Sequence, residues 1–213
     1  MKIIEPSAEL VDKINPDEIL RKIELCGRVS HQSQPREDSA ENFVRMLIKR
    51  GHESVLEHVS LTFHIICDRA IMAELTRHRL ASFTVESTRY VKYNDLEFIA
   101  PDLPADSLAY RHWYSKMFVA EETYNVMIND SARPEQARSI LPLCLKTELY
   151  MTANLRELRH ILKLRCSEKA HPQMRLIAGM ILDVFKDKLP VIVEDINHEG
   201  RLLANSGCAQ LRN

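Results

Sequence analysis

Two segments of the chain alternate between apolar and polar side chains, and they constrain the fold most. In the first, Val59, Leu61, Phe63 and Ile65 alternate with polar residues, and residues 143–151 repeat the pattern. A period of two is typical of a β-strand that buries one face. Each segment is therefore predicted to be a strand with one side in a core.

Helical patterns occupy most of the remaining chain. Asn15-Pro16-Asp17-Glu18 is typical of a helix start, and the helix is predicted to run to about Gly27. Further helices are predicted from near Ser39 to Gly51, after Asp68, from Asp106 to about Asp130, from Asn154, and from His171-Pro172. A short strand is predicted over residues 90–93. The expected fold class is α/β (α+β), a small mixed sheet flanked by long helices.

The composition limits the architecture and the surroundings. No Pro/Gly/Ser-rich linker divides the chain, so residues 1–213 are predicted to be a single domain. The chain has five glycines and no Gly-x-Gly, which excludes a Rossmann fingerprint and a P-loop. Five widely spaced cysteines without a Cys-x-x-Cys pair indicate reduced thiols. No apolar run is long enough to span a bilayer, so we expect a cytoplasmic protein without a membrane partner.

The densest group of anion-binding side chains is Arg77-His78-Arg79, followed after seven residues by Ser87-Thr88-Arg89-Tyr90. Guanidiniums and hydroxyls are the donors that hold an oxyanion such as a phosphate. The alternative is a solvated basic helix end, because the triplet is predicted to fall at the C-terminal end of the helix after Asp68. Neighbouring helical residues point about 100° apart, so Arg77 and Arg79 are expected to serve different neighbours.

The helix predicted from Asn154 carries a second group of polar residues. At about 100° per residue, Arg165 lies within about 40° of Asn154 and extends an otherwise apolar face. Its side chain either snorkels to solvent or faces a cleft as a fixed cation. Arg156 and His160 are four residues apart and share another face.

Two other kinds of function remain open from the residues alone. A nucleic-acid module would use Arg77, Arg79, Arg89 and Arg111, but the formal net charge of -1 provides no field that attracts a polyanion. A metal hydrolase would use His52 and His58, yet these are six residues apart and would lie on opposite sides of a helix. We therefore predict no metal and no nucleic-acid partner.

Four motifs, in order, resemble the flavin-dependent thymidylate synthase family. They are Gly51-His52-Glu53-Ser54 with Glu57-His58, Arg77-His78-Arg79-x7-Ser87, Ala137-Arg138-Ser139-Ile140-Leu141-Pro142, and Asn154-Leu155-Arg156 with Leu164-Arg165. The resemblance covers about residues 50–190. It implies a homotetramer with shared active sites and FAD bound outside any Rossmann fold. It also implies methylation of dUMP to dTMP, with 5,10-methylenetetrahydrofolate as carbon donor and NADPH as reductant of the flavin.

The resemblance also implies roles for individual residues. Those expected to contact dUMP are Glu74, Arg77, Glu86, Ser87, Arg89, Arg138 and Arg165. Those expected to contact FAD are Ser54, His78, Arg79, Leu80, Asn154, Arg156 and His160. His52 would lie near the flavin and the folate.

One of these residues is expected to be catalytic. Arg165 would stabilise an ionised uracil edge electrostatically, because a guanidinium keeps its proton at physiological pH. The chain departs from the family at Glu74, where many relatives have Gln, at Val85, where several have an acid, and at His160, where some have Asn.

Overall fold

The longest strands lie side by side at the centre of the protein. The computed structural model describes residues 1–198, in which β3 (Ser60–Asp68) pairs antiparallel with β6 (Lys146–Asn154) along its whole length. β2 (Ser7–Leu10) and β4 (Ser82–Val85) complete a four-stranded antiparallel sheet of order β2-β3-β6-β4. β1 (Lys2–Ile4) and β5 (Glu97–Ile99) form a separate parallel pair. The prediction of one mixed sheet is therefore wrong, because the parallel and the antiparallel strands form two separate sheets.

The predicted alternation of the two long strands is confirmed. Leu61, Phe63 and Ile65 of β3 are buried, as are Leu149 and Met151 of β6. β6 begins later than its sequence pattern, because the chain turns at Pro142, whose carbonyl accepts from the Leu145 N–H at 3.1 Å. Leu143 is accordingly 70% exposed.

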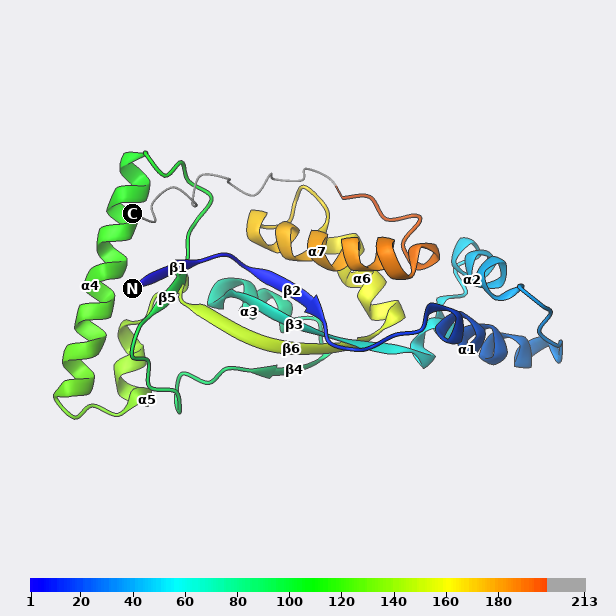
Figure 1. Ribbon diagram of the computed structural model, residues 1–213, viewed down its shortest axis with the longest axis horizontal. Helices are drawn as coiled ribbons and strands as arrows, with labels where there is room; N and C mark the ends of the chain where they lie inside the picture. Colours follow the sequence, from blue (N-terminus) through cyan, green and yellow to red (C-terminus); the bar gives the residue numbers. More distant parts are fainter. Residues whose placement is uncertain (199–213) are drawn as a thin grey trace.

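Helices cover one side of the sheet and both ends of the molecule (Figure 1). α6 (Leu155–Arg165) and α7 (Pro172–Lys188) lie along the sheet, α1 (Pro16–Arg28) and α2 (Ala40–Lys49) at one end, and α4 (Leu108–Asn129) at the other. The short helices are α3 (Arg69–Leu75) and α5 (Pro134–Ala137), and the 3-10 turns are η1 (Val29–His31), η2 (Glu53–His58), η3 (Arg138–Ile140) and η4 (Pro190–Ile192).

Side chains at the helix ends confirm the predicted starts. Asn15 caps α1, Asp68 caps α3 and Asn154 caps α6, each through a side-chain oxygen that accepts a backbone N–H. Gly51, just after α2, has a φ of +72°, a conformation that glycine adopts without strain. The sequence therefore sets the limits of these helices.

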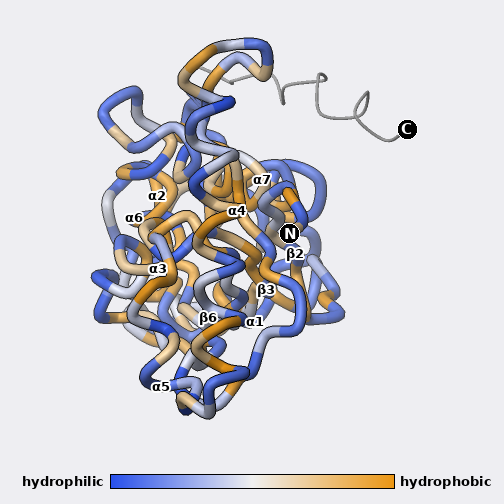
Figure 2. Tube along the Cα trace, turned by 90° about the vertical axis from the view of Figure 1, so that its left-hand side faces the viewer, coloured by the Kyte–Doolittle hydropathy of each residue, from blue (hydrophilic) through white to orange (hydrophobic). Residues whose placement is uncertain are grey.

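The buried apolar residues form two clusters. The larger joins the four-stranded sheet to α6 and α7 and includes Phe63, Met151 and Phe185. The smaller joins α4 to the parallel pair through Phe98 and Tyr124. Figure 2 shows mainly hydrophobic segments inside the molecule and hydrophilic loops around it. Among residues 1–198, no helix has the length and apolar content needed to cross a membrane.

The strand predicted over residues 90–93 is wrong. That segment is a turn followed by irregular chain, and the strands of this region are β4 and β5. β4 is only four residues long and forms because the edge of β6 offers hydrogen-bond partners, with Thr84 opposite Tyr150. Local sequence does not contain that information.

Candidate active site

The basic triplet lies in the turn between α3 and β4, not in the helix as predicted. α3 ends at Leu75, and the His78 N–H donates to the Leu75 carbonyl at 3.0 Å. The Ala81 N–H then donates to the His78 carbonyl at 3.0 Å. This turn buries His78, while Arg77 and Arg79 on either side are exposed. The turn therefore separates His78 from both arginines, while the different neighbours expected for Arg77 and Arg79 stay a prediction.

His78 joins this turn to α6. Its Nδ1 lies 3.3 Å from Oε1 of Glu157, and both side chains are only 6% exposed. On the other side of the ring, Nε2 accepts a hydrogen bond of 3.1 Å from Nε of Arg165. The ring of His160 stands edge-on to it, with 6.0 Å between centroids. His78 is thus the centre of a polar cluster packed between two elements.

Arg165, at the end of α6, is held by α3 as well. Its Nη1 lies 3.0 Å from Oε2 of Glu74, and its Nη2 donates to the Glu74 carbonyl oxygen at 3.4 Å. The side chain of Arg165 is 20% exposed. Arg165 is therefore a cation fixed at the edge of the cluster and does not snorkel to solvent, while the cleft expected beside it stays a prediction. Glu74, His78, His160 and Arg165 are four predicted site residues that the fold brings together.

The environment of His78 keeps its ring neutral. Burial, then the positive charges of Arg165 and His160, lower the pKa of His78 from 6.5 to about 4. Burial also raises the pKa of the Glu157 carboxyl. At neutral pH the cluster therefore contains an uncharged imidazole between a carboxylate and a guanidinium.

His78 is expected to make stability depend on pH. The unfolded chain binds a proton at His78 near pH 6.5, whereas the folded chain binds it only near pH 4. Between these values the unfolded state holds more protons, so the free energy of unfolding should decrease as the pH falls. Urea unfolding at pH 7 and pH 5 should show a smaller decrease in His78→Gln than in the wild type. Equal decreases would contradict the prediction.

The start of α6 is linked to the 52–58 segment. The Leu155 N–H donates to the Val59 carbonyl at 2.9 Å, and Asn154 pairs with Ser60 across β6 and β3. Nη1 of Arg156 lies 2.5 Å from Oε1 of Glu57. The predicted residues of this area form a second, exposed group: His52, Ser54, Asn154 and Arg156, of which Asn154 is half-buried.

A third group lies in the loop after β4. Nη1 of Arg138 donates to Oγ1 of Thr88 at 3.3 Å, so the second arginine motif meets the loop that contains Ser87 and Arg89. Glu86 is engaged with the Tyr93 hydroxyl and with Nζ of Lys146 at 3.2 Å. Within residues 1–198, no hydrogen bond or ion pair joins the Thr88–Arg138 pair to the His78–Arg165 cluster.

Four of the predicted arginines differ from the rest in their partners. In the part of the chain that the structure describes, no ion pair with a carboxylate involves Arg77, Arg79, Arg89 or Arg138, and all four are exposed. Arg156 and Arg165, in contrast, are paired with glutamates. The four unpaired guanidiniums are available to bind anions. Leu80, another predicted site residue, follows Arg79 in the chain and is 78% exposed.

His78, Glu157 and His160 also have the spacing of metal ligands, with donor atoms within 4.8 Å of one another. Arg165 argues against a metal there. A metal on Nδ1 would leave the proton of the neutral ring on Nε2, which faces the Nε–H donor of Arg165 at 3.1 Å. The N–H of His78 Nε2 and the N–H of Arg165 Nε would then point at each other and repel. His52 and His58 are not part of this group, the only one of its kind found in residues 1–198.

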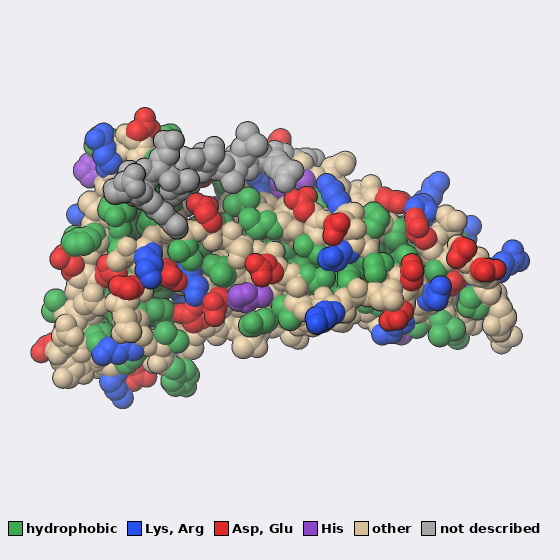
Figure 3. Space-filling view, viewed as in Figure 1, with side chains coloured by type: hydrophobic (Ala, Val, Ile, Leu, Met, Phe, Trp, Pro, Cys, Tyr) green, Lys and Arg blue, Asp and Glu red, His purple; other side chains and the backbone are tan. Residues whose placement is uncertain are grey.

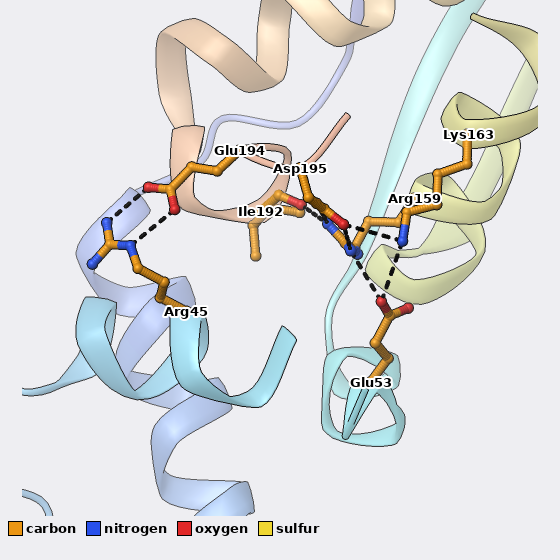
Figure 4. A network of polar contacts seen from close by, with 7 residues as sticks. All are labelled: Arg45, Glu53, Arg159, Lys163, Ile192, Glu194 and Asp195. Carbon is orange, nitrogen blue, oxygen red and sulfur yellow. Dashed lines mark hydrogen bonds and ion pairs between the residues drawn. The ribbon is translucent and has the colours of Figure 1, made fainter. Parts of the chain in front are cut away.

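A buried arginine network supports the opposite side of α6 (Figure 4). Arg159 is 1% exposed, and its two terminal nitrogens lie 2.8 and 2.9 Å from the carboxylate oxygens of Asp195. Nη2 also donates to Glu53 at 3.0 Å, and Nη1 donates to the Ile192 carbonyl. The network connects α6 with η2 and with the segment after η4. The network therefore fixes Glu53, which stands between His52 and Ser54 in the chain.

Sequence reasoning missed two residues of these clusters. Glu157 stands three residues after Asn154, and its backbone N–H donates to the Asn154 side chain at 2.9 Å, but nothing local marks its carboxylate as part of a site. Arg159 was not singled out at all. A charged residue among Leu155, Leu158 and Leu162 was the available signal for it.

The structure thus combines an α/β fold with four exposed guanidiniums that lack a carboxylate partner within residues 1–198 and with a separate cluster in which His78 lies between Glu157 and Arg165. The family model described as thymidylate synthase complementing protein matches residues 9–191. The chain belongs to the flavin-dependent thymidylate synthase family.

Curated relatives carry that name. The flavin-dependent thymidylate synthase of Pyrococcus furiosus is 36% identical over 169 residues, which are 76% of this chain and 69% of the relative. That of Thermococcus onnurineus is 38% identical over 152 residues, which are 68% of this chain but only 62% of the relative. A probable flavin-dependent thymidylate synthase of Mycobacterium phage D29 is 31% identical over 218 residues and 92% of both chains.

Proposed function

We propose that this protein methylates dUMP to dTMP with 5,10-methylenetetrahydrofolate as carbon donor and FAD, reduced by NADPH, as hydride carrier. The observation that supports this best is the Arg165 cluster, in which Glu74 and His78 hold a guanidinium that is still 20% exposed. A fixed cation of this kind stabilises negative charge that develops on a bound uracil ring. The family membership supports the same reaction.

The residues proposed to bind dUMP fall into two groups. The unpaired guanidiniums of Arg77, Arg89 and Arg138 suit the phosphate, together with the Ser87 hydroxyl. Arg165, with Glu74 beside it, suits the uracil edge. Glu86 already contacts Tyr93 and Lys146, so its proposed role is to shape the loop that carries Ser87.

The other motif residues fit FAD. Its diphosphate needs cationic donors, which exposed Arg79 and Arg156 supply. Exposed His160 and the apolar side chain of Leu80 suit contact with the rings, and we assign Ser54, His78, Asn154 and His52 to the same side of the site. When bound, FAD supplies the hydride chemistry, and the chain supplies binding and orientation.

We also propose that the active site is shared between copies in a homotetramer. Within residues 1–198, no hydrogen bond or ion pair joins the Thr88–Arg138 pair to the His78–Arg165 cluster. In an assembly, the Thr88–Arg138 pair of one copy can meet the His78–Arg165 cluster of another copy. α4 has exposed apolar residues Leu108, Val119 and Val126 within about 20° of one another on the helix. Buried Met117 and Tyr124 lie on the opposite side. α4 is thus apolar on both sides, which is typical of a helix between subunits.

Other observations favour this function over nucleic-acid binding. On the face in Figure 3, acidic and basic side chains are interspersed and form no basic stripe.

The cysteines bear on the compartment in which the protein acts. The four cysteines among residues 1–198 are free thiols, which supports a reducing compartment such as the cytoplasm. Cys208 lies outside the described residues.

The visible spectrum tests the proposal. Protein purified with added FAD should retain it, and dUMP should change the flavin absorption because both ligands share one site. NADPH should remove the absorption at long wavelength, and dTMP should form only when methylenetetrahydrofolate is present. A protein that retains no FAD, or that forms dTMP without folate, contradicts the proposal.

A further inference from the structure

We propose that Glu157 is a positioning residue that acts through His78 on Arg165. Its carboxylate holds the His78 ring with the proton on Nδ1, so that Nε2 remains free to accept from the Arg165 guanidinium. The proposal rests on the proposed function for the role of Arg165, whereas the arrangement of the three side chains is independent of it.

The position of the ring proton follows from the chemistry of the partners. A guanidinium has only donors, so the 3.1 Å contact from Nε of Arg165 requires an unprotonated Nε2 on His78. A neutral imidazole then has its N–H on Nδ1. That atom lies 3.3 Å from Oε1 of Glu157, so the negative carboxylate faces the N–H. The opposite tautomer would place two N–H groups against each other at Arg165 and turn an unprotonated Nδ1 toward the Glu157 carboxylate.

Glu157 is well suited to this task. Its backbone N–H is used by the Asn154 cap, which leaves the side chain for other contacts. In residues 1–198, the one ion pair of the Glu157 carboxylate is with His78, while a ring nitrogen of His160 lies within 4.8 Å. Because both the Glu157 and the His78 side chains are only 6% exposed, water screens their contact little. The carboxylate therefore acts together with Arg165 to keep the proton on Nδ1.

The effect reaches Arg165 because its guanidinium is held along three directions. His78 fixes Nε, the Glu74 carboxylate fixes Nη1, and the Glu74 carbonyl fixes Nη2. Without Glu157, Arg165 alone favours the Nδ1–H tautomer, so the ring adopts the other tautomer more often and then repels Nε of Arg165. The guanidinium then rotates away from the direction in which it meets the uracil edge.

The charged and titratable groups around the ring are consistent with a neutral His78. They are Glu157, His160 and Arg165 from α6 and Glu74 from α3. The two carboxylates favour a protonated ring, but burial and the direct contact of Arg165 outweigh them and keep His78 neutral. Protonation of His78 would oppose Arg165. The cluster thus maintains a fixed tautomer over the physiological range.

The test compares Glu157→Leu with Glu157→Gln. Leucine fills the space but accepts no hydrogen bond, whereas the glutamine oxygen still accepts from Nδ1. In protein labelled with ¹⁵N-histidine, the signal lost in His78→Gln identifies the ring. We expect the Nδ1–H tautomer in the wild type and in Glu157→Gln, and its loss in Glu157→Leu. At saturating FAD, kcat for dTMP formation should be lower by about tenfold to a hundredfold in Glu157→Leu, and near the wild-type value in Glu157→Gln.

Glu121→Leu is the matched control. Glu121 is also a buried carboxylate, but it binds the Leu96 N–H at 2.9 Å and the N-terminal amine at 2.8 Å, in the smaller core. This variant should lose thermal stability and keep the His78 tautomer. If Glu157→Leu fails to fold, Glu157→Ala takes its place.

The outcomes separate the two proposals. An Nε2–H or doubly protonated His78 in the wild type at pH 7 overturns the arrangement. A changed tautomer in Glu157→Leu with wild-type kcat overturns the positioning role. If the wild type forms no dTMP at all, the proposed function fails, while the tautomer measurement still decides whether Glu157 controls His78.

Discussion

Arg165→Ala is expected to lower kcat for dTMP formation by about a hundredfold to a thousandfold, the usual cost of removing one fixed electrostatic donor. The fold should persist, because the side chain is 20% exposed and its partner Glu74 is 34% exposed, so water solvates the remaining carboxylate. FAD content should also persist, since the residues assigned to its diphosphate are Arg79 and Arg156. Turnover, circular dichroism and the flavin spectrum measure these three quantities.

Two further variants make the Arg165 prediction specific. Arg165→Lys keeps the charge but has no fork to bond Glu74 twice, so its kcat should lie between those of wild type and alanine. Arg21→Ala removes an exposed arginine of α1 and should retain wild-type turnover. Wild-type kcat in Arg165→Ala would exclude this residue from the active site.

Local sequence predicted the fold where the signal itself is local. The starts of α1, α3 and α6 follow from capping side chains within three residues of the helix, and β3 follows from its own alternation. β4 was missed because it depends on the edge of β6, about sixty residues further along the chain. The single domain over residues 1–213 stays a prediction, since residues 199–213 lie outside the described part.

The candidate site, too, could be predicted only where the signal lies in the local sequence. Arg165 was identified because an arginine on an apolar helix face is itself unusual. Its partners were not predicted, because Glu74 and His78 reach it only after α3 and α6 pack together. The roles of the motif residues came from the family resemblance, and they stay predictions, although the structure gathers several of these residues into one cluster.

Arg159→Ala is expected to lower the free energy of unfolding by about 3 kcal/mol. The variant removes a side chain that is 1% exposed and leaves Glu53 and Asp195 without their main cation. Breaking a buried ion pair costs about 3–5 kcal/mol, and the lower value applies because Asp195 is 43% exposed and Lys163 lies 3.2 Å from it. Urea unfolding at one protein concentration and pH 7 measures the difference.

Arg45→Ala provides the matched control, because the two arginines bind adjacent carboxylates of the same segment. Nη2 of Arg45 lies 2.8 Å from Oε1 of Glu194, but these side chains are 40% and 45% exposed. Water screens this pair, so its removal should leave the urea midpoint close to the wild-type value. If both variants lose the same stability, burial does not distinguish the two contacts.

Arg159 also holds Glu53, which stands between His52 and Ser54. We therefore expect Arg159→Ala, but not Arg45→Ala, to weaken FAD retention.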